Sequence, residues 1–284
     1  MKMRPAAPRH SVVPALLVCL LCSCTKNPPS MILSLALSPG MERTMRFVTE
    51  QRTGRLEGTS VRPDNSSVSF TYRFRVTSID AARTAKLECA VQEAHVTPGS
   101  AAADSYLKGL TRQKLMMVID KDGHVLSLKG DTPGFAPGGP VTPGSVSPTM
   151  PAQGDLRGFF GALTGRKVSV GDTWTSDLAQ SGSQGLQGTL TWTLAAVAGT
   201  TARLQYSGRL EQREISLQRL PPGKRAFMHG EMSGYILLEL DTGWPAQGRS
   251  VMNAEVSMRD AGAQELAATR LVSLSLITRF EPVQ

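Results

Sequence analysis

Strict alternation of apolar and polar side chains is the feature that most restricts how this chain can fold. It is clearest in residues 68–76, where valine, phenylalanine or tyrosine at every second position alternates with serine, threonine or arginine. Residues 271–276 alternate in a similar way. Because successive side chains of a strand point to opposite faces, a period of two indicates strands that are buried on one face. We therefore expect a mainly β, antiparallel fold.

Turn residues divide the chain into hairpins. Residues 31–51 contain an apolar run, the dipeptide Pro39-Gly40 and a second extended stretch, and are expected to form one hairpin. Residues 114–128 contain a strongly apolar strand, the turn Asp120–Gly123 and a returning strand, and predict another hairpin. The sequence thus favours antiparallel meanders.

Two β-rich stretches, residues 31–130 and 155–284, flank a segment of different composition. Residues 131–154 are rich in proline and glycine, and Asp131 is the only charged residue among them. Such a segment cannot build a core, so it is a flexible linker or a long loop. Directly after it, apolar residues at helical spacing predict one short helix over residues 155–163.

The two β-rich halves resemble each other. Residues 70–74 parallel residues 190–194, and the turn that begins at Asp120 parallels the turn that begins at Asp241. A repeated offset of this kind indicates duplication of one supersecondary unit. We therefore expect two related β-meanders, which form either one curved sheet or open barrel, or two packed lobes.

The N-terminus carries an export signal. Residues 1–23 begin with a basic segment and continue into an apolar stretch that is too short to span a bilayer. The sequence Leu21-Cys22-Ser23-Cys24 resembles a bacterial lipobox, with leucine three residues before the cysteine and a small residue directly before it. This implies cleavage before Cys24 and lipidation of its sulfur, so that residues 24–30 form a lipidated tether. The alternative is an ordinary cleaved signal without lipid.

Lipidation would place the protein in a bacterial cell envelope. More than one acyl chain on Cys24 would hold it permanently at a membrane. Thr25 follows the cysteine where an inner-membrane retention signal would have aspartate. We therefore expect the outer membrane, facing the periplasm, if the source has two membranes. Loss of three basic residues with the signal lowers the net charge from +8 to +5, and no nucleic-acid partner is expected.

The remaining residues offer no recognisable catalytic or metal-binding set. His95, His124 and His229 stand apart from one another, and Cys89 is the one cysteine that follows Cys24. Cys89 alternates with Leu87 and Val91, which predicts a buried, unreactive thiol. No metal, no cofactor and no catalytic residue is assigned, and we expect that the protein is not an enzyme.

Three stretches, taken together, resemble an uncharacterised family of bacterial exported lipoproteins with a domain of unknown function. They are Leu33–Met45, Val168–Trp174 and Gly230–Gly243. The resemblance implies a β-rich envelope lipoprotein and implies no activity. More loosely, lipidation combined with about eleven strands looks like the Lol-type lipid-carrier lipoproteins, which fold a half-closed barrel around acyl chains.

These observations favour a non-catalytic, lipid-anchored envelope protein that binds a hydrophobic ligand such as an acyl chain. The enriched methionines, among them Met116, Met117, Met228 and Met232, would line either the core or an adaptable apolar pocket. Two alternatives stay open at this point. One is a structural or assembly lipoprotein that docks to another envelope protein, and the less favoured one is an envelope hydrolase.

The lipidation hypothesis predicts that cells expressing this protein incorporate radiolabelled palmitate into it. The Cys24→Ser variant should incorporate none, because the sulfur that accepts the lipid is missing. Autoradiography of the immunoprecipitated protein measures the difference. Equal labelling of the two proteins, or no labelling of the unaltered one, would contradict the hypothesis.

Overall fold

The computed structural model describes most of the chain after its N-terminal segment, namely residues 30–57, 60–99, 107–109, 111, 114–130, 160–163, 165–178, 186–215, 223–260 and 269–283. The predicted signal peptide, Cys24 and the linker at 131–154 lie outside the described residues. Those predictions remain untested.

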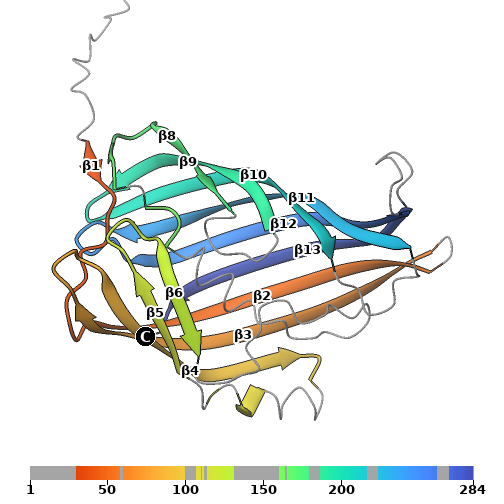
Figure 1. The fold of residues 1–284 in the computed structure, drawn as a ribbon, viewed down its shortest axis with the longest axis horizontal. Coiled ribbons are helices and arrows are strands. Elements are labelled where there is room, and N and C mark those ends of the chain that lie inside the picture. Colours follow the sequence, from red (N-terminus) through yellow and green to blue (C-terminus); the bar gives the residue numbers. More distant parts are fainter. Residues whose placement is uncertain are drawn as a thin grey trace, which may run out of the picture.

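One large antiparallel sheet dominates the described residues (Figure 1). From edge to edge its eleven strands are β6 (Val125–Gly130), β5 (Lys114–Ile119), β4 (Ala85–Thr97), β3 (Ser60–Ile79), β2 (Glu42–Glu57), β13 (Thr269–Pro282), β12 (Pro245–Asp260), β11 (Lys224–Glu239), β10 (Thr201–Ile215), β9 (Leu186–Ala198) and β8 (Thr173–Asp177). A separate pair consists of β1 (Met31–Ile32) and β7 (Lys167–Val168). The predicted mainly β, antiparallel fold is confirmed, and β6 and β8 form the two edges of the large sheet as far as the structure describes the chain.

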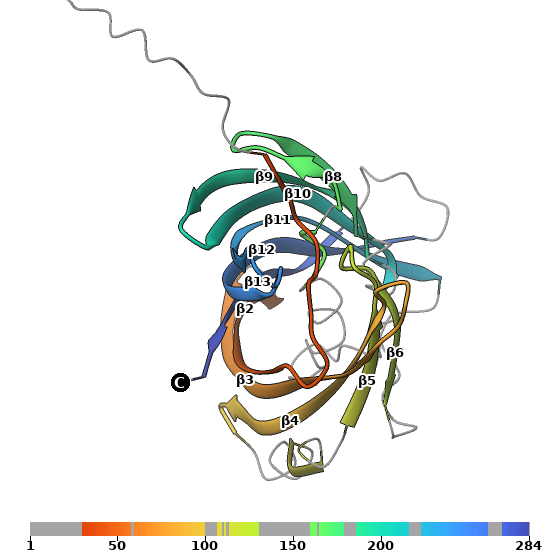
Figure 2. The ribbon, with the colours of Figure 1, turned by 90° about the vertical axis from the view of Figure 1, so that its left-hand side faces the viewer.

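The first and last long strands of the chain pair with each other at the middle of the sheet. Phe47 of β2 lies opposite Phe280 of β13, and their rings stack with centroids 5.6 Å apart. On its other side, Phe47 lies opposite Phe70 of β3. This pairing joins the strands of both chain halves into one continuous sheet, which curls around its core (Figure 2). Of the arrangements that the sequence left open, the structure has the single curved sheet.

We call the face of the sheet that carries Phe47, Phe70 and the rest of the core the inner face. Glycines on this face let the sheet bend tightly. A Cβ on Gly248 would lie 2.4 Å from the ring of Phe280. A Cβ on Gly234 would lie 2.6 Å from the hydroxyl oxygen of Tyr206. Large rings thus lie directly over strand positions without side chains, which is how curved sheets accommodate bulky inner residues.

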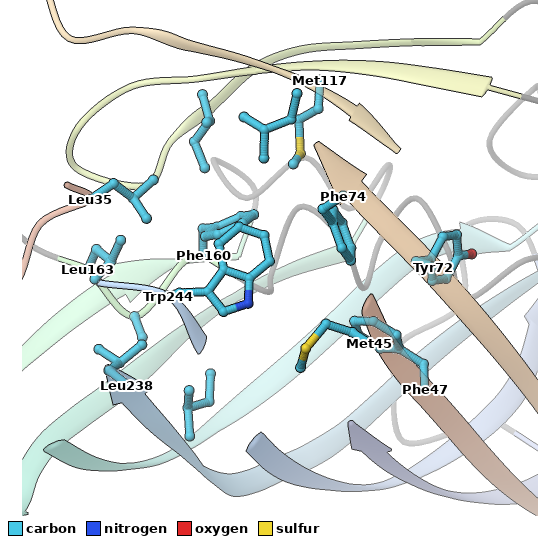
Figure 3. Packing of buried hydrophobic residues seen from close by; sticks show 14 of the residues in the cluster. Leu35, Met45, Phe47, Tyr72, Phe74, Met117, Phe160, Leu163, Leu238 and Trp244 are labelled. Atoms are coloured by element: carbon cyan, nitrogen blue, oxygen red, sulfur yellow. The ribbon is translucent and has the colours of Figure 1, made fainter. Parts of the chain in front are cut away.

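An aromatic plug of Phe74, Phe160 and Trp244 fills one end of the curl (Figure 3). The ring of Trp244 meets the ring of Phe74 edge-on at 5.4 Å and the ring of Phe160 edge-on at 5.3 Å. Phe74 belongs to β3, whereas Trp244 lies in the turn before β12. The plug therefore connects strands of the two chain halves across the inside of the sheet. Leucines from several segments surround it, including Leu35, Leu163 and Leu238.

A strap of residues 33–41 crosses the same end of the curl (Figure 2). Its Leu35 N–H donates to the carbonyl of Lys121 at 2.7 Å, and its Ala36 N–H donates to the carbonyl of Thr242 at 2.8 Å. These carbonyls belong to the β5–β6 and β11–β12 turns, so the strap links the two chain halves. The predicted hairpin over 31–51 is wrong, because β1 pairs with β7 and the following residues form this strap.

The predicted helix over 155–163 is not found in the part that the structure describes. Residues 155–159 lie outside the described chain, and residues 160–162 form a turn. Phe160 and Leu163 are buried in the plug region, so their apolar spacing reflects core packing. A short helical stretch occurs instead at residues 107–109.

The plug should contribute strongly to stability. Trp244 is only 1% exposed, and Trp244→Ala is expected to lower the free energy of unfolding by about 3–5 kcal/mol because it leaves a cavity between the sheet walls. Leu126→Ala removes a side chain that is 60% exposed and should change the free energy by less than about 0.5 kcal/mol. Guanidinium chloride unfolding measures both, and equal effects would exclude a special role for the plug.

Candidate functional site

Beyond the plug, the inner face continues as an uncharged surface with an apolar centre. Pairing across strands β10, β11, β12, β13 and β2 places Gly208, Met232, Met252, Leu276 and Gln51 in one row. Residues directly opposite each other in an antiparallel sheet share a face, so these side chains point inward together. Strand spacing of about 4.8 Å gives the three central side chains of this row a span of about 10 Å.

The neighbouring rows have the same neutral character. On one side the row is Leu210, Gly230, Ala254, Leu274 and Thr53, and on the other it is Tyr206, Gly234, Ser250, Thr278 and Thr49. None of these fifteen positions carries an ionisable acid or base other than the Tyr206 hydroxyl. The hydroxyl oxygens of Thr49 and Thr278 lie 3.1 Å apart and satisfy each other. An uncharged surface with Met232, Met252 and Leu276 at its centre suits an uncharged molecule with an apolar part.

Burial distinguishes this surface from the plug. Met232, Met252 and Leu276 are only partly buried, whereas Phe74 and Trp244 are almost completely buried. Met232 and Met252 pack against the core cluster at its margin. Methionine has three rotatable bonds and a polarisable sulfur, so paired methionines adapt to apolar partners of different shape. We therefore treat the partly buried residues of these rows, centred on Met232, Met252 and Leu276 and called the methionine surface below, as the candidate binding site; Leu210 and Ala254 of the same rows are buried in the core.

The outer face of the sheet is chemically different. A groove of about 670 Å³ extends over β11, β12, β13, β2 and β3. Its polar lining includes Arg52, His229, Glu231, Asn253, Glu255 and Ser273. The ring nitrogen Nε2 of His229 lies 3.8 Å from Oε2 of Glu255. In the register, Glu255 stands between His229 and Ser273. A serine nucleophile needs its histidine base beside it, so this row does not have the order of a catalytic triad.

His124, one of the histidines noted in the sequence, stabilises a turn. Its ring nitrogen Nδ1 and its backbone N–H both contact the carboxylate of Asp120 at 2.9 Å. Burial by itself raises the pKa of Asp120, but the hydrogen bonds and charge of His124, with a further bond from the Asp122 N–H, bring that pKa below its ordinary value of 3.8. The Asp120 carboxylate stabilises the β5–β6 turn, and the Lys121 carbonyl of this turn accepts a hydrogen bond from the strap.

Within the described ranges, no three histidine, cysteine, aspartate or glutamate side chains gather as a metal site. Nor does any helix in the described part of the chain have the length and apolar character to span a membrane.

The structure places some sequence-selected residues at the candidate site and others elsewhere. Met228 and Met232 lie on inner-face positions of β11, while Met117 is fully buried in the core and Met116 is 38% exposed. Met252 was not singled out from the sequence. Its position beside Met232 depends on the β11–β12 register, which a single sequence does not specify.

Comparison with known proteins indicates that part of the chain is similar to an uncharacterised domain family. A family of unknown function (DUF6263) matches residues 153–245, a range that contains two of the three stretches on which the resemblance was based. No curated protein matches the chain. Among solved structures, the chain aligns with Salmonella typhi OmpF in complex with daunomycin at 6% identity, covering 86% of this chain and 98% of that one. Their TM-score of 0.23 is too low to support any conclusion about fold or function.

The structure also makes a prediction about Cys89. Burial, and secondarily the negative charge of Glu88, raises the pKa of the Cys89 thiol to about 12. Iodoacetamide at pH 8 should therefore leave Cys89 unmodified in the folded protein, because the thiolate is scarce and inaccessible. It should modify Cys89 fully in 6 M guanidinium chloride, as read by peptide mass spectrometry. Rapid modification under native conditions would contradict the buried position in β4.

Proposed function

We propose that this chain is a non-catalytic, lipid-anchored protein of the bacterial cell envelope that binds a hydrophobic ligand such as an acyl chain. The observation that carries the proposal is the methionine surface, an uncharged, partly exposed area with an apolar centre that continues from the core along the inside of a curled sheet. The lipobox-like sequence that ends at Cys24 supports the envelope location. In a bacterium with two membranes, the protein would face the periplasm from the outer membrane.

The energetics of such binding are favourable. Each methylene that is fully buried contributes about 0.8 kcal/mol, so ten fully buried methylenes set an upper limit on the order of 8 kcal/mol before the costs of immobilisation. Met232, Met252 and Leu276 offer thioether and aliphatic groups with no charge to desolvate. A flexible chain fits this chemistry better than a polar or ionic ligand does.

The open edges of the sheet favour a second candidate function. Strands β6 and β8 have a neighbour on one side only within the described sheet. Exposed edges can pair with an extended segment of another protein, as in β-augmentation. A structural or assembly protein that docks through such an edge would need no ligand on the inner face, and this difference separates the two candidates.

Native mass spectrometry of protein extracted gently from its membrane tests the proposal. The unaltered protein should carry a releasable acyl-lipid mass beyond that of the lipidated polypeptide. Met232→Gln should lower the occupied fraction by at least about fivefold, because an amide facing an apolar ligand lacks hydrogen-bond partners. The matched control is Glu231→Gln, which changes the adjacent, outward-facing residue of β11 and should retain the ligand.

Two results would contradict this function. One is the absence of any releasable ligand from the unaltered protein, which would favour docking through a sheet edge. The other is the same occupancy in the two variants, which would move the ligand away from the methionine surface. Thermal unfolding of each variant shows whether the fold is retained.

A further inference from the structure

A second pocket lies on the outer face of the sheet, over strands β9 to β12. It has a volume of about 440 Å³. Two arginines, Arg203 of β10 and Arg249 of β12, line it together with Tyr235 of β11. It is on the opposite side of the sheet from the methionine surface, so what it binds is independent of the function proposed above.

Tyr235 is a neighbour of both arginines. The guanidinium carbon of Arg203 lies 4.9 Å from the centre of the Tyr235 ring, a cation–π contact that orients a long side chain. Arg249 stands directly opposite Tyr235 in the β11–β12 register. The two basic side chains therefore share one aromatic neighbour and face the same pocket. A planar guanidinium presents several N–H donors in a fixed geometry that matches phosphate and carboxylate oxygens.

Among the described residues, the pocket holds positive charge without a compensating carboxylate. No described aspartate or glutamate lines it, and neither Arg203 nor Arg249 forms an ion pair with a described residue. Nearby acids on the same face have other basic partners. Glu231 lies 3.9 Å from Arg209, and Glu50 lies 3.1 Å from Arg279.

Neutral hydrogen-bonding groups complete the lining. Hydroxyl and amide side chains surround the arginines, and they belong to Thr191, Thr193, Gln205, Ser207 and Ser233. Two guanidinium groups together with these donors can satisfy the several oxygens of one phosphate. We propose that this pocket is a binding site for a phosphate-bearing ligand, with Arg203 and Arg249 holding the phosphate.

Titration calorimetry of the full chain in dodecyl maltoside tests this site with two probes. Glycerol 3-phosphate represents a free phosphate compound, and dihexanoyl phosphatidylglycerol below its micellar concentration represents a phospholipid headgroup. Saturable binding that weakens with added salt is expected for at least one of them. Similar affinities would assign a free phosphate compound, whereas markedly tighter binding of the phospholipid would assign a headgroup.

Charge-removing variants connect the binding to the pocket. Arg203→Gln combined with Arg249→Gln should weaken binding by at least about tenfold, because charge-assisted hydrogen bonds are lost. Arg209→Gln is the matched control, since Arg209 lies on the same face of β10 outside the pocket, and it should keep the wild-type affinity. Tyr235→Leu should weaken binding less than the double variant does, because the arginines remain but Arg203 loses its ring contact.

Three results would overturn the proposal. They are no saturable binding of either probe, unchanged affinity in the double variant, and equal losses in the double variant and Arg209→Gln. Circular dichroism of each variant verifies that the sheet is intact, so a loss of binding reports on the pocket.

Discussion

The edge-on packing of Trp244 between Phe74 and Phe160 is the interaction on which the rest of the architecture depends. Within the described residues, β6 and β8 are the two edges of the curled sheet, and no hydrogen-bonded ladder joins them. Side-chain packing across the inside holds the facing strands together instead, and the plug supplies it at one end. The strap reinforces that end, since its backbone binds turns of both chain halves. Close packing of this kind favours one arrangement of the facing strands. If a void opened between them, the side chains would lose dispersion contacts and apolar burial.

The position of the plug explains why the two faces of the sheet differ in chemistry. Large aromatic residues fill one end of the inner face, and smaller or more flexible residues, including Gly208, Met232 and Met252, continue beyond it. That region stays uncharged and partly exposed. The outer face carries arginines, acids and hydroxyl groups in shallow pockets. A single strand such as β11 therefore contributes Met232 to one environment and Tyr235 to the other, as the period-two geometry of a strand requires.

Much of this fold could be predicted from local sequence, because strand geometry is expressed locally. The apolar positions of residues 68–76 are all buried, and the turn at Asp120–Gly123 lies between β5 and β6. Long-range features could not be predicted. Nothing near Phe47 indicates that it pairs with Phe280, more than two hundred residues away. The apolar run after Met31 looks like a strand. Its side chains instead pack into the core beside the plug, and its backbone forms hydrogen bonds with three separate segments of the chain. The candidate site could not be predicted either, because Met232 and Met252 become neighbours only through the pairing register of β11 and β12.

The central claim is that the methionine surface holds an apolar chain. A fatty acid with a photoreactive diazirine on its acyl chain tests this directly, because irradiation attaches the probe to whatever side chains surround it. The account predicts crosslinks on peptides that contain Met232, Met252 and Leu276, and competition by unlabelled fatty acid. Crosslinks confined to outer-face residues, or labelling that excess fatty acid fails to reduce, would contradict it.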